Sequence, residues 1–455
     1  MSSTEVRVEF IKSTQTKIDC LQSGNNFSKV LSYLNTIDFN QTQKIDFLSC
    51  SDPFILLDKA LENSQNLKVI RISKASNEMF NQNSNQMQSI KMLSITAVSG
   101  TLNITEGFFP STALQSIALH RIEKLSLANA FKRTTELRYL TIGKSRITDL
   151  DDRTFRNLVK IKRIIFENNN LTRLPDGIFS HTIKLKNIFF VEKKLRTLPM
   201  NLFLNTKEIE EFQMTEANCM ENFPENIFSD QKQFKSFLFV RMKGCLGSSI
   251  GSLKLAGTMF HNSNVQKIRF IKTGETEIPS NFLSGCSKLE MFQLQDGALV
   301  RLPPHLFKDS RNISYVDFSG NSLESLPPQL FEGLTGLTTV RLKRNNFYSL
   351  DQNLFKNIKN IKIIHLQSNR INTIEISALK NNKQIEEIDL SGNAFTEIPK
   401  ELTQTESLKT IRLAQNAIKA IRMEDILQNL TNLNELDLKY GTNKQNRLKI
   451  KLYFF

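Results

Sequence analysis

Residues 313–336 read ISYVDFSGNSLESLPPQLFEGLTG, and residues 337–350 begin the same pattern again with LTTVRLKRNNFYSL. In both copies, apolar residues recur at fixed offsets, an asparagine follows, and a second pair of apolar residues closes the stretch. The shared template is L-x-x-L-x-L-x-x-N-x-L-x-x-L. Self-similarity at a fixed period indicates a repeat architecture, in which one unit cannot bury its apolar face alone.

The template continues on both sides of this stretch. Further copies start at 137, 161, 185, 209, 234, 265, 289, 361, 385, 408 and 433, so most steps are 24 residues. Degenerate copies start near Ile45, Leu67, Ile90 and Leu114. We therefore expect about 17 repeats of roughly 24 residues in one elongated solenoid, although a length of 455 residues would ordinarily suggest several domains.

Each repeat should contain a short strand, because the segment x-x-L-x-L-x-x alternates as a half-buried strand does. The asparagine can hydrogen-bond the backbone of the turn that leaves the strand, and stacking would align these amides as a ladder. The expected ladder residues are Asn169, Asn321, Asn345, Asn369, Asn393 and Asn416. A recurring phenylalanine should return the convex side to the core, at Phe155, Phe179, Phe203, Phe228, Phe282, Phe307, Phe331 and Phe355.

Leu-Pro pairs such as Leu174-Pro175 and Leu326-Pro327 precede that phenylalanine, so the convex segment reads L-P-x-x-x-F-x-x-L. This pattern resembles the "typical" class of leucine-rich repeats, found in Toll-like receptor ectodomains, small leucine-rich proteoglycans and arthropod cell-surface adhesion proteins. The resemblance covers nearly the whole chain. It implies an α/β solenoid, a horseshoe with a parallel β-sheet on its concave face and irregular, 3-10 or short helical segments on its convex face. It does not define the function, because one fold serves many functions.

Departures from the template suggest three regions. Residues 1–66 would form an N-terminal cap with a degenerate first repeat, and 67–440 a solenoid of about 16 repeats. The step from Phe234 to Val265 is 31 residues, which predicts an irregular projecting loop at 244–262. Residues 441–455 would form a basic and apolar C-terminal tail. An open edge of the sheet would be prone to pair with other chains. We therefore expect either that this tail covers the edge or that the sequence stops early.

The five cysteines include no C-x-x-C pair, so a zinc site of the usual spacing is not expected. Extracellular solenoids often fix their N-terminal cap with disulfides, which makes Cys20–Cys50 a candidate bridge, with two buried thiols as the alternative. Cys219 is expected to be a packed thiol, or else to bond Cys245. Glycosylation would be permitted in a secreted chain at Asn26, Asn40, Asn103, Asn170, Asn312 and Asn429.

Catalysis is not expected. Residues 247–251 match G-x-S-x-G, but the strand before, the helix after and the partner Asp and His that a nucleophile elbow needs are missing from the sequence context. The five histidines are scattered without metal-ligand spacing. We therefore predict a non-enzymatic chain with no cofactor and no metal.

The formal net charge is +15, which favours acidic partners, although no dense Lys/Arg block occurs. No run of 18 apolar residues is present, so no transmembrane segment is expected. The sequence near Met1 shows no apolar leader. Under the extracellular interpretation the gene model would be incomplete, whereas the cytoplasmic interpretation requires no leader.

The repeat register also predicts the outward residues of the concave face. Between Asp317 and Asp437 the central residue of each strand largely alternates in charge, which predicts structural pairing across the sheet. Between Ile165 and Met291, apolar side chains with a charged rim predict an interaction surface. The alternative is that these side chains cover one another on a tightly curved sheet. The candidate ligand-binding residues are Ile165, Phe189, Val191, Leu238, Val240, Arg241, Arg269, Ile271 and Met291.

These observations favour an extracellular or cell-surface recognition, adhesion or receptor-like module that binds a protein ligand on its concave face. The alternatives are an intracellular leucine-rich-repeat scaffold, or a binder of anionic glycans or, less in keeping with the sequence, of nucleic acid.

Overall fold

The computed structural model describes residues 7–12, 14–20, 41–50, 66–74, 89–106, 108–109, 113–127, 130–242, 253–350, 355, 358–375, 379, 382–419, 428–439 and 449–451. The chain forms two compact units. Unit 1 comprises Met1–Met220 with Lys243–Gly247, and unit 2 comprises Glu221–Met242 with Ser248–Phe455.

Unit 1 is built on a sheet whose successive strands run parallel, each pairing with the next repeat's strand. In order they are β2 (Gln15–Asp19), β3 (Lys44–Leu48), β4 (Val69–Ser73), β5 (Met92–Asn103), β6 (Ser116–Ser126), β7 (Tyr139–Gly143), β9 (Arg163–Glu167), β10 (Asn187–Val191) and β11 (Glu211–Thr215). The short β8 (Ile147–Asp149) pairs with the end of β6.

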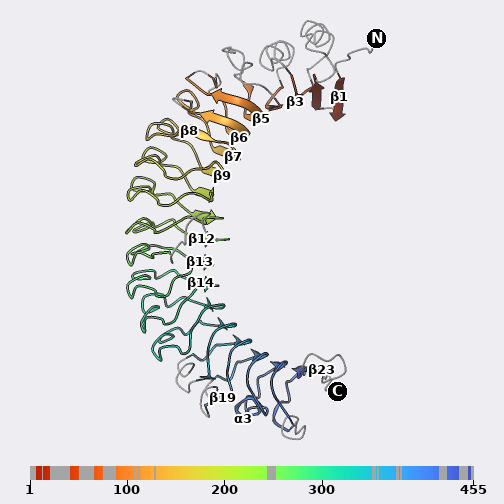
Figure 1. Ribbon diagram of the computed structural model, residues 1–455, viewed down its shortest axis with the longest axis vertical. Helices are drawn as coiled ribbons and strands as arrows, with labels where there is room; N and C mark the ends of the chain where they lie inside the picture. Colours follow the sequence, from red (N-terminus) through yellow and green to blue (C-terminus); the bar gives the residue numbers. More distant parts are fainter. Residues whose placement is uncertain are drawn as a thin grey trace. The chain divides into compact units, whose positions relative to one another are not determined.

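Unit 2 continues the same scheme with its own parallel strands. They are β12 (Ser236–Val240), β13 (Lys267–Ile271), β14 (Met291–Gln295), β15 (Tyr315–Asp317), β16 (Thr339–Arg341), β18 (Ile363–His365), β20 (Glu387–Asp389), β21 (Thr410–Arg412) and β22 (Glu435–Asp437). A small second sheet pairs β17 (Ser349–Leu350) with β19 (Thr373–Ile374). Within each unit the strands line the inner side of the curve and the turns its outer side (Figure 1).

The parallel solenoid is therefore the fold that the repeat pattern predicts. Strands such as β10 alternate half-buried and buried residues, so that Ile188 and Phe190 enter the core. In the described convex segments, turns predominate, and the four-residue α3 (Lys400–Thr403) is a single helical turn. Convex phenylalanines stack from repeat to repeat, with ring centroids 6.0 Å apart for Phe155 and Phe179. These contacts bury the face that a single repeat would leave open.

The asparagines after the strands hydrogen-bond the backbone of adjacent repeats. Asn369 Nδ2 donates to the carbonyl oxygens of Leu342 and Leu366 at 3.0 and 2.8 Å. Its Oδ1 accepts the backbone N–H groups of Asn345 and Phe347 at 3.1 and 3.2 Å. The remaining ladder amides donate to carbonyl oxygens in the same way; they are Asn169, Asn321, Asn345, Asn393 and Asn416.

A residue with positive φ directly follows many of the strands. In unit 1 this position holds Lys144 (φ 52°) and Asn168 (φ 55°), and in unit 2 it holds Lys272 (φ 59°) and Asp296 (φ 51°). The corresponding residue of β6, Arg121 (φ 54°), lies within its longer strand. The left-handed conformation turns the chain sharply away from the sheet. As a consequence, side chains at this position line up along the edge of the sheet where the strands end.

The projecting loop predicted at 244–262 does not include the residues from Leu253 onwards. Residues 243–252 lie outside the described residues, but Leu253, Met259 and Phe260 are buried. Phe260 stacks on Phe228 with ring centroids 5.6 Å apart. The part from Leu253 onwards is therefore packed convex structure and not a projecting loop, because its apolar side chains fill the convex positions of the repeat.

Antiparallel strands cover one edge of the sheet in each unit. In unit 1, β1 (Arg7–Lys12) pairs with β2, and in unit 2, β23 (Lys449–Lys451) pairs with β22. Of the two expectations for the C-terminal tail, the described part of it therefore follows the first: it covers the edge.

Candidate interaction surface

The candidate ligand residues of unit 1 lie side by side on the inner face of the sheet. Phe189 is paired in register with Ile165 on β9 and with Gln213 on β11, and Val191 is paired with Glu167 and Thr215. Ile165, Phe189 and Val191 are all half-buried. The Arg163 guanidinium lies 5.6 Å from the centre of the Phe189 ring, so a cation–π contact covers part of this ring.

The candidates of unit 2 form a second group on its own inner face. Leu238 pairs with Arg269 and Val240 with Ile271 across β12 and β13. Met291 on β14 is paired with Lys267 on β13 and with Tyr315 on β15. All five of the predicted residues are half-buried: Leu238, Val240, Arg269, Ile271 and Met291. The predicted surface thus divides into one apolar group in each unit, both with basic neighbours.

Arg241 differs from the prediction, because its side chain is buried and not presented on the inner face. Its Nη1 donates to the carbonyl oxygen of Thr273 at 3.0 Å, and its backbone N–H donates to Ile271 at 3.0 Å. Arg241 lies one residue beyond β12, where the alternation of the strand ends. Burial lowers its pKa, and the nearby carboxylate of Glu275 opposes that shift.

Two buried glutamates were missed by the sequence analysis. Glu275 occupies the position that leucine takes in the template, and burial raises its pKa to about 7, against the effect of Thr273 and Arg241. Glu192 is fully buried beside the ladder, where its carboxylate accepts Asn169 N and Nδ2. Burial raises the pKa of Glu192 to about 7, although these hydrogen bonds favour the ionised form. The sequence signal for Glu275 was a glutamate at a template position that is otherwise apolar and buried.

The charged column of unit 2 pairs differently from the prediction. Asp389 is paired in register with His365 and Arg412 and was their expected partner. Both side chains contact Glu387 instead: His365 Nε2 lies 3.0 Å from Glu387 Oε1, and Arg412 donates a hydrogen bond to the same oxygen. Asp389 instead accepts the backbone N–H of Ser391 at 3.0 Å, as Asp317 does from Ser319 at 2.9 Å. The aspartates therefore cap the turn after their strands, because they sit two residues before an unpaired backbone donor.

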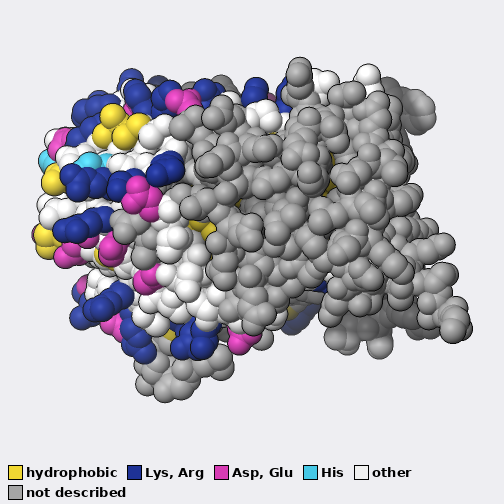
Figure 2. All heavy atoms as spheres, turned by 90° about the horizontal axis from the view of Figure 1, so that it is seen from above, with side chains coloured by type: hydrophobic (Ala, Val, Ile, Leu, Met, Phe, Trp, Pro, Cys, Tyr) yellow, Lys and Arg dark blue, Asp and Glu magenta, His cyan; other side chains and the backbone are white. Residues whose placement is uncertain are grey.

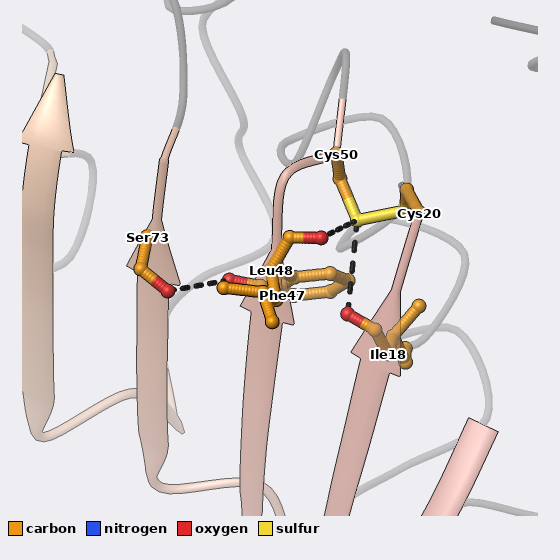
Figure 3. Close-up of a disulfide and its surroundings, with 6 residues drawn as sticks. All are labelled: Ile18, Cys20, Phe47, Leu48, Cys50 and Ser73. Carbon is orange, nitrogen blue, oxygen red and sulfur yellow. Dashed lines mark hydrogen bonds between the residues drawn. A yellow bond between two sulfur atoms is a disulfide. The ribbon is translucent and has the colours of Figure 1, made fainter. Parts of the chain in front are cut away.

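The N-terminal cysteines form a disulfide. Cys20 and Cys50 follow β2 and β3 and are joined across neighbouring repeats, with their Cα atoms 4.8 Å apart (Figure 3). The Sγ atom of Cys50 lies near the carbonyl oxygens of Ile18 and Leu48, at 3.8 and 3.6 Å. These are packing contacts, since a disulfide sulfur has no proton to donate.

The other cysteines divide into bonded and free. Cys219 is disulfide-bonded and not the packed thiol expected from its core position, and Cys245 lies outside the described residues. Cys286 is a free thiol whose pKa burial raises to about 12. Of the candidate glycosylation sites, Asn26 and Asn40 lie outside the described residues. The others are exposed: Asn103, Asn170, Asn312 and Asn429.

The described surface shows no group of three or more His, Cys, Asp or Glu side chains placed to hold a metal ion. The G-x-S-x-G segment at 247–251 lies outside the described residues. None of the helices in the described ranges is long and apolar enough to cross a membrane. Dark blue Lys and Arg side chains are prominent on the described part of the face in Figure 2, with magenta Asp and Glu between them.

Repeated strands, an asparagine ladder and a stacked convex phenylalanine row define the molecule as a leucine-rich-repeat solenoid. A family model for the BspA type leucine rich repeat region matches residues 102–235, 252–322 and 300–434. The chain belongs to this family.

Solved structures share the fold. The Toll chain of the Drosophila Toll–Spätzle complex superposes with a TM-score of 0.65 at 19% identity, covering 96% of this chain and 59% of Toll. This chain therefore spans little more than half of the length of that relative. A leucine-rich-repeat protein of Leptospira interrogans has a TM-score of 0.64 at 18% identity, covering 90% of this chain and 97% of its own. Comparison with curated protein sequences finds no match.

Proposed function

We propose that this protein is a non-enzymatic recognition module that binds a protein ligand on the inner, strand-lined faces of its units. The observation that carries the proposal is the pair of partly exposed apolar groups with basic neighbours. Ile165, Phe189 and Val191 form the group in unit 1, and Leu238, Val240 and Ile271 form the group in unit 2. Apolar surface with a charged rim is typical of protein interfaces.

Arg269 and Met291 extend the group in unit 2, whereas Arg241 has no part in it because its guanidinium is buried. The Toll chain to which this fold is similar was solved in complex with a protein, Spätzle. The repeat spacing and the L-P-x-x-x-F segments also support assignment to the typical repeat class.

We further propose that the chain acts outside the cell or at its surface, as an adhesion or receptor-like module. Two observations support this location: the Cys20–Cys50 bridge and the disulfide-bonded state of Cys219. Disulfides persist in oxidising compartments and are rare in the cytosol. Carbohydrate attached at Asn103, Asn170, Asn312 or Asn429 would fit that location, because these side chains are exposed. The division into an N-terminal cap at 1–66, a solenoid at 67–440 and a tail at 441–455 remains our proposal for its organisation.

Substitutions on the inner face test the binding proposal. Full-length protein is used to capture partners from secreted and surface-exposed extracts, and captured proteins are then purified and their affinities measured by surface plasmon resonance. Phe189→Asp in unit 1 and Leu238→Asp in unit 2 should each weaken binding of such a partner at least tenfold, since a buried carboxylate would face apolar partner atoms. The controls Gln213→Asp and Gln293→Asp place the same charge in the same columns. Unchanged binding by the Phe189 and Leu238 double variant would refute the proposal.

A further inference from the structure

A shallow groove of about 560 Å³ crosses four consecutive repeats of unit 1. It runs over the middle of the long strands β5 and β6 and just beyond the ends of β7 and β9. One wall is the row of residues that directly follow or interrupt the strands: Ala97, Arg121, Lys144 and Asn168. The other wall lies two residues further along each repeat: Ser99, Glu123, Arg146 and Asn170. We call this hollow the exit groove.

The floor between the two walls is closed. Val98, Ile122 and Ser145 line it and are each at most 2% exposed. Val98 is paired with Ile122 across β5 and β6, and Ser145 Oγ accepts the Ile122 N–H at 3.1 Å. The groove is therefore a continuous channel along the stacking direction, and its floor has no pocket for a large side chain.

Basic groups predominate on the walls. Arg121, Lys144 and Arg146 are exposed, whereas Glu123 contributes the one carboxylate among the lining residues and accepts the Gly100 N–H at 2.8 Å. Lys144 also lies 3.2 Å from Glu167, but its side chain stays 52% exposed and can face a ligand. Neutral hydrogen-bonding side chains lie on either side of these charges, with Ser99 in the first of the four repeats and Asn168 and Asn170 in the last.

A histidine, His120, lies beside the basic residues Arg121 and Lys144. His120 precedes Arg121 on β6, and its ring lies against Gly143, the residue before Lys144. Burial lowers the pKa of His120, Glu167 opposes this shift, and Lys144 and Arg121 lower the pKa further.

We propose that the exit groove binds an acidic polysaccharide, a linear carbohydrate chain carrying sulfate or carboxylate groups. A channel across successive repeats suits a linear polymer, and guanidinium groups pair with sulfate or carboxylate in two-pronged hydrogen bonds. The hydroxyl of Ser99 and the amides of Asn168 and Asn170, at the two ends of the groove, can hydrogen-bond the uncharged hydroxyl groups of such a chain. This site lies apart from the apolar group of the inner face and goes beyond the proposed protein-binding function.

The chemistry of the groove favours carbohydrate over the other linear polyanions. Single-stranded nucleic acid is held by stacking its bases on aromatic side chains, and the lining residues include no aromatic one. An acidic peptide would need recesses for its side chains, which the closed floor does not offer.

The experiment measures binding of a size-defined heparin oligosaccharide to the full-length chain by calorimetry over a series of salt concentrations. All proteins carry Thr172→Ala, so that no carbohydrate can be attached at Asn170. The groove variant combines Arg121→Gln, Lys144→Gln and Arg146→Gln. The matched control combines Lys68→Gln, Lys91→Gln and Lys162→Gln, three exposed lysines that precede the strands and so lie at the opposite edge of the same sheet. Both variants lose the same charge.

The groove variant should bind at least about tenfold more weakly and show a shallower salt dependence, because fewer counterions are exchanged. The control should stay within about threefold of the parent, because only general attraction is reduced. Ser99→Trp adds bulk to the groove without changing charge, and it should also abolish binding. No heparin binding by the parent, equal losses in the two triple variants, or full binding by Ser99→Trp would each overturn the proposal. Groove-dependent binding of poly(U) in place of heparin would overturn the assignment to carbohydrate.

Discussion

Glu192 holds both nitrogens of Asn169: its Oε1 lies 2.9 Å from the backbone N and 2.9 Å from Nδ2. The carboxylate thus continues the asparagine ladder in a repeat that has an exposed lysine, Lys193, at the ladder position. Oε2 also lies 3.4 Å from the backbone N of Leu171. A buried carboxylate replaces an amide here, and its ionisation is therefore coupled to folding.

Stability should fall as the pH rises through the folded pKa of Glu192. This pKa is raised from 4.5 to about 7, so the folded chain holds a proton that the unfolded chain releases. The resulting stability is fully present below about pH 4.5 and is lost progressively as the pH rises to about 7, a change of roughly 3 kcal/mol at most. The raised pKa of Glu275 should likewise lower the stability as the pH rises.

Urea denaturation at about pH 5 and about pH 7.5 checks this expectation. Glu192→Gln cannot ionise, so the loss of unfolding free energy between the two pH values should be smaller than in the parent by about 2 kcal/mol. Glu225→Gln, at an exposed glutamate, should leave the pH dependence as it is in the parent. An identical pH dependence in Glu192→Gln and the parent would contradict the coupling.

Arg241 and Glu275 should depend on each other. Each is buried, and the Glu275 carboxylate raises the pKa of Arg241 against the effect of burial. Glu275→Leu restores the apolar residue of the template but leaves a buried guanidinium without that charge, at a cost of roughly 3 kcal/mol. The double variant Arg241→Met with Glu275→Leu should cost less than the sum of the single variants. A double-mutant cycle by chemical denaturation measures this coupling, and additive effects would disprove it.

Removing the Cys20–Cys50 bridge should destabilise the first repeats of unit 1. The bridge closes a segment with a sequence separation of 30 residues. Cys20→Ser with Cys50→Ser should lower the free energy of unfolding by about 2–4 kcal/mol, mainly because the unfolded chain gains freedom. Urea denaturation together with limited proteolysis near β2 and β3 gives the readout. Cys286→Ser is the control, since a hydroxyl can replace the thiol that donates to Phe260 O; a comparable loss in that variant would speak against a specific effect of the bridge.

The centre of the asparagine ladder should be sensitive to truncation. Asn369→Ala removes the acceptor of two buried N–H groups and the donor to two buried carbonyl oxygens. The loss should be about 3 kcal/mol, because buried polar groups left without partners are costly. Asn372→Ala, at an exposed residue of the same repeat, should change stability by less than about 0.5 kcal/mol. Similar effects of the two variants in thermal denaturation would show that the ladder bonds contribute little.

The sequence was sufficient to predict the solenoid and its register, because both follow from local periodicity. The repeat register places Thr141, Ile165, Phe189 and Gln213 at the same position of successive strands, and these residues are paired one with the next in unit 1. Such pairing is fixed once successive repeats stack in parallel, since a slip by one residue would expose the core side chains.

Side chains that leave the repeat pattern were not predictable in the same way. Arg241 follows its strand by one residue, and periodicity alone cannot say whether such a residue continues the outward column or turns inward. The alternation in charge predicted that Asp389 would pair across the sheet, but it bonds the backbone of its own turn, because alternation in charge does not report the competing backbone donors. The exit groove depends on the shape between two rows, which no one-dimensional pattern contains.

Stacking by backbone hydrogen bonds also determines how the chain would respond to pulling. Within a unit the residue before each strand donates to the corresponding residue of the previous repeat, as Lys186 does to Lys162 at 2.9 Å and Lys162 to Arg138 at 2.8 Å. Each repeat is thus held by its neighbours alone, and force applied to the ends of a unit detaches one coil at a time. A repeat of 24 residues releases about 80 Å of extended chain, so the protein should yield under tension in small, nearly equal steps.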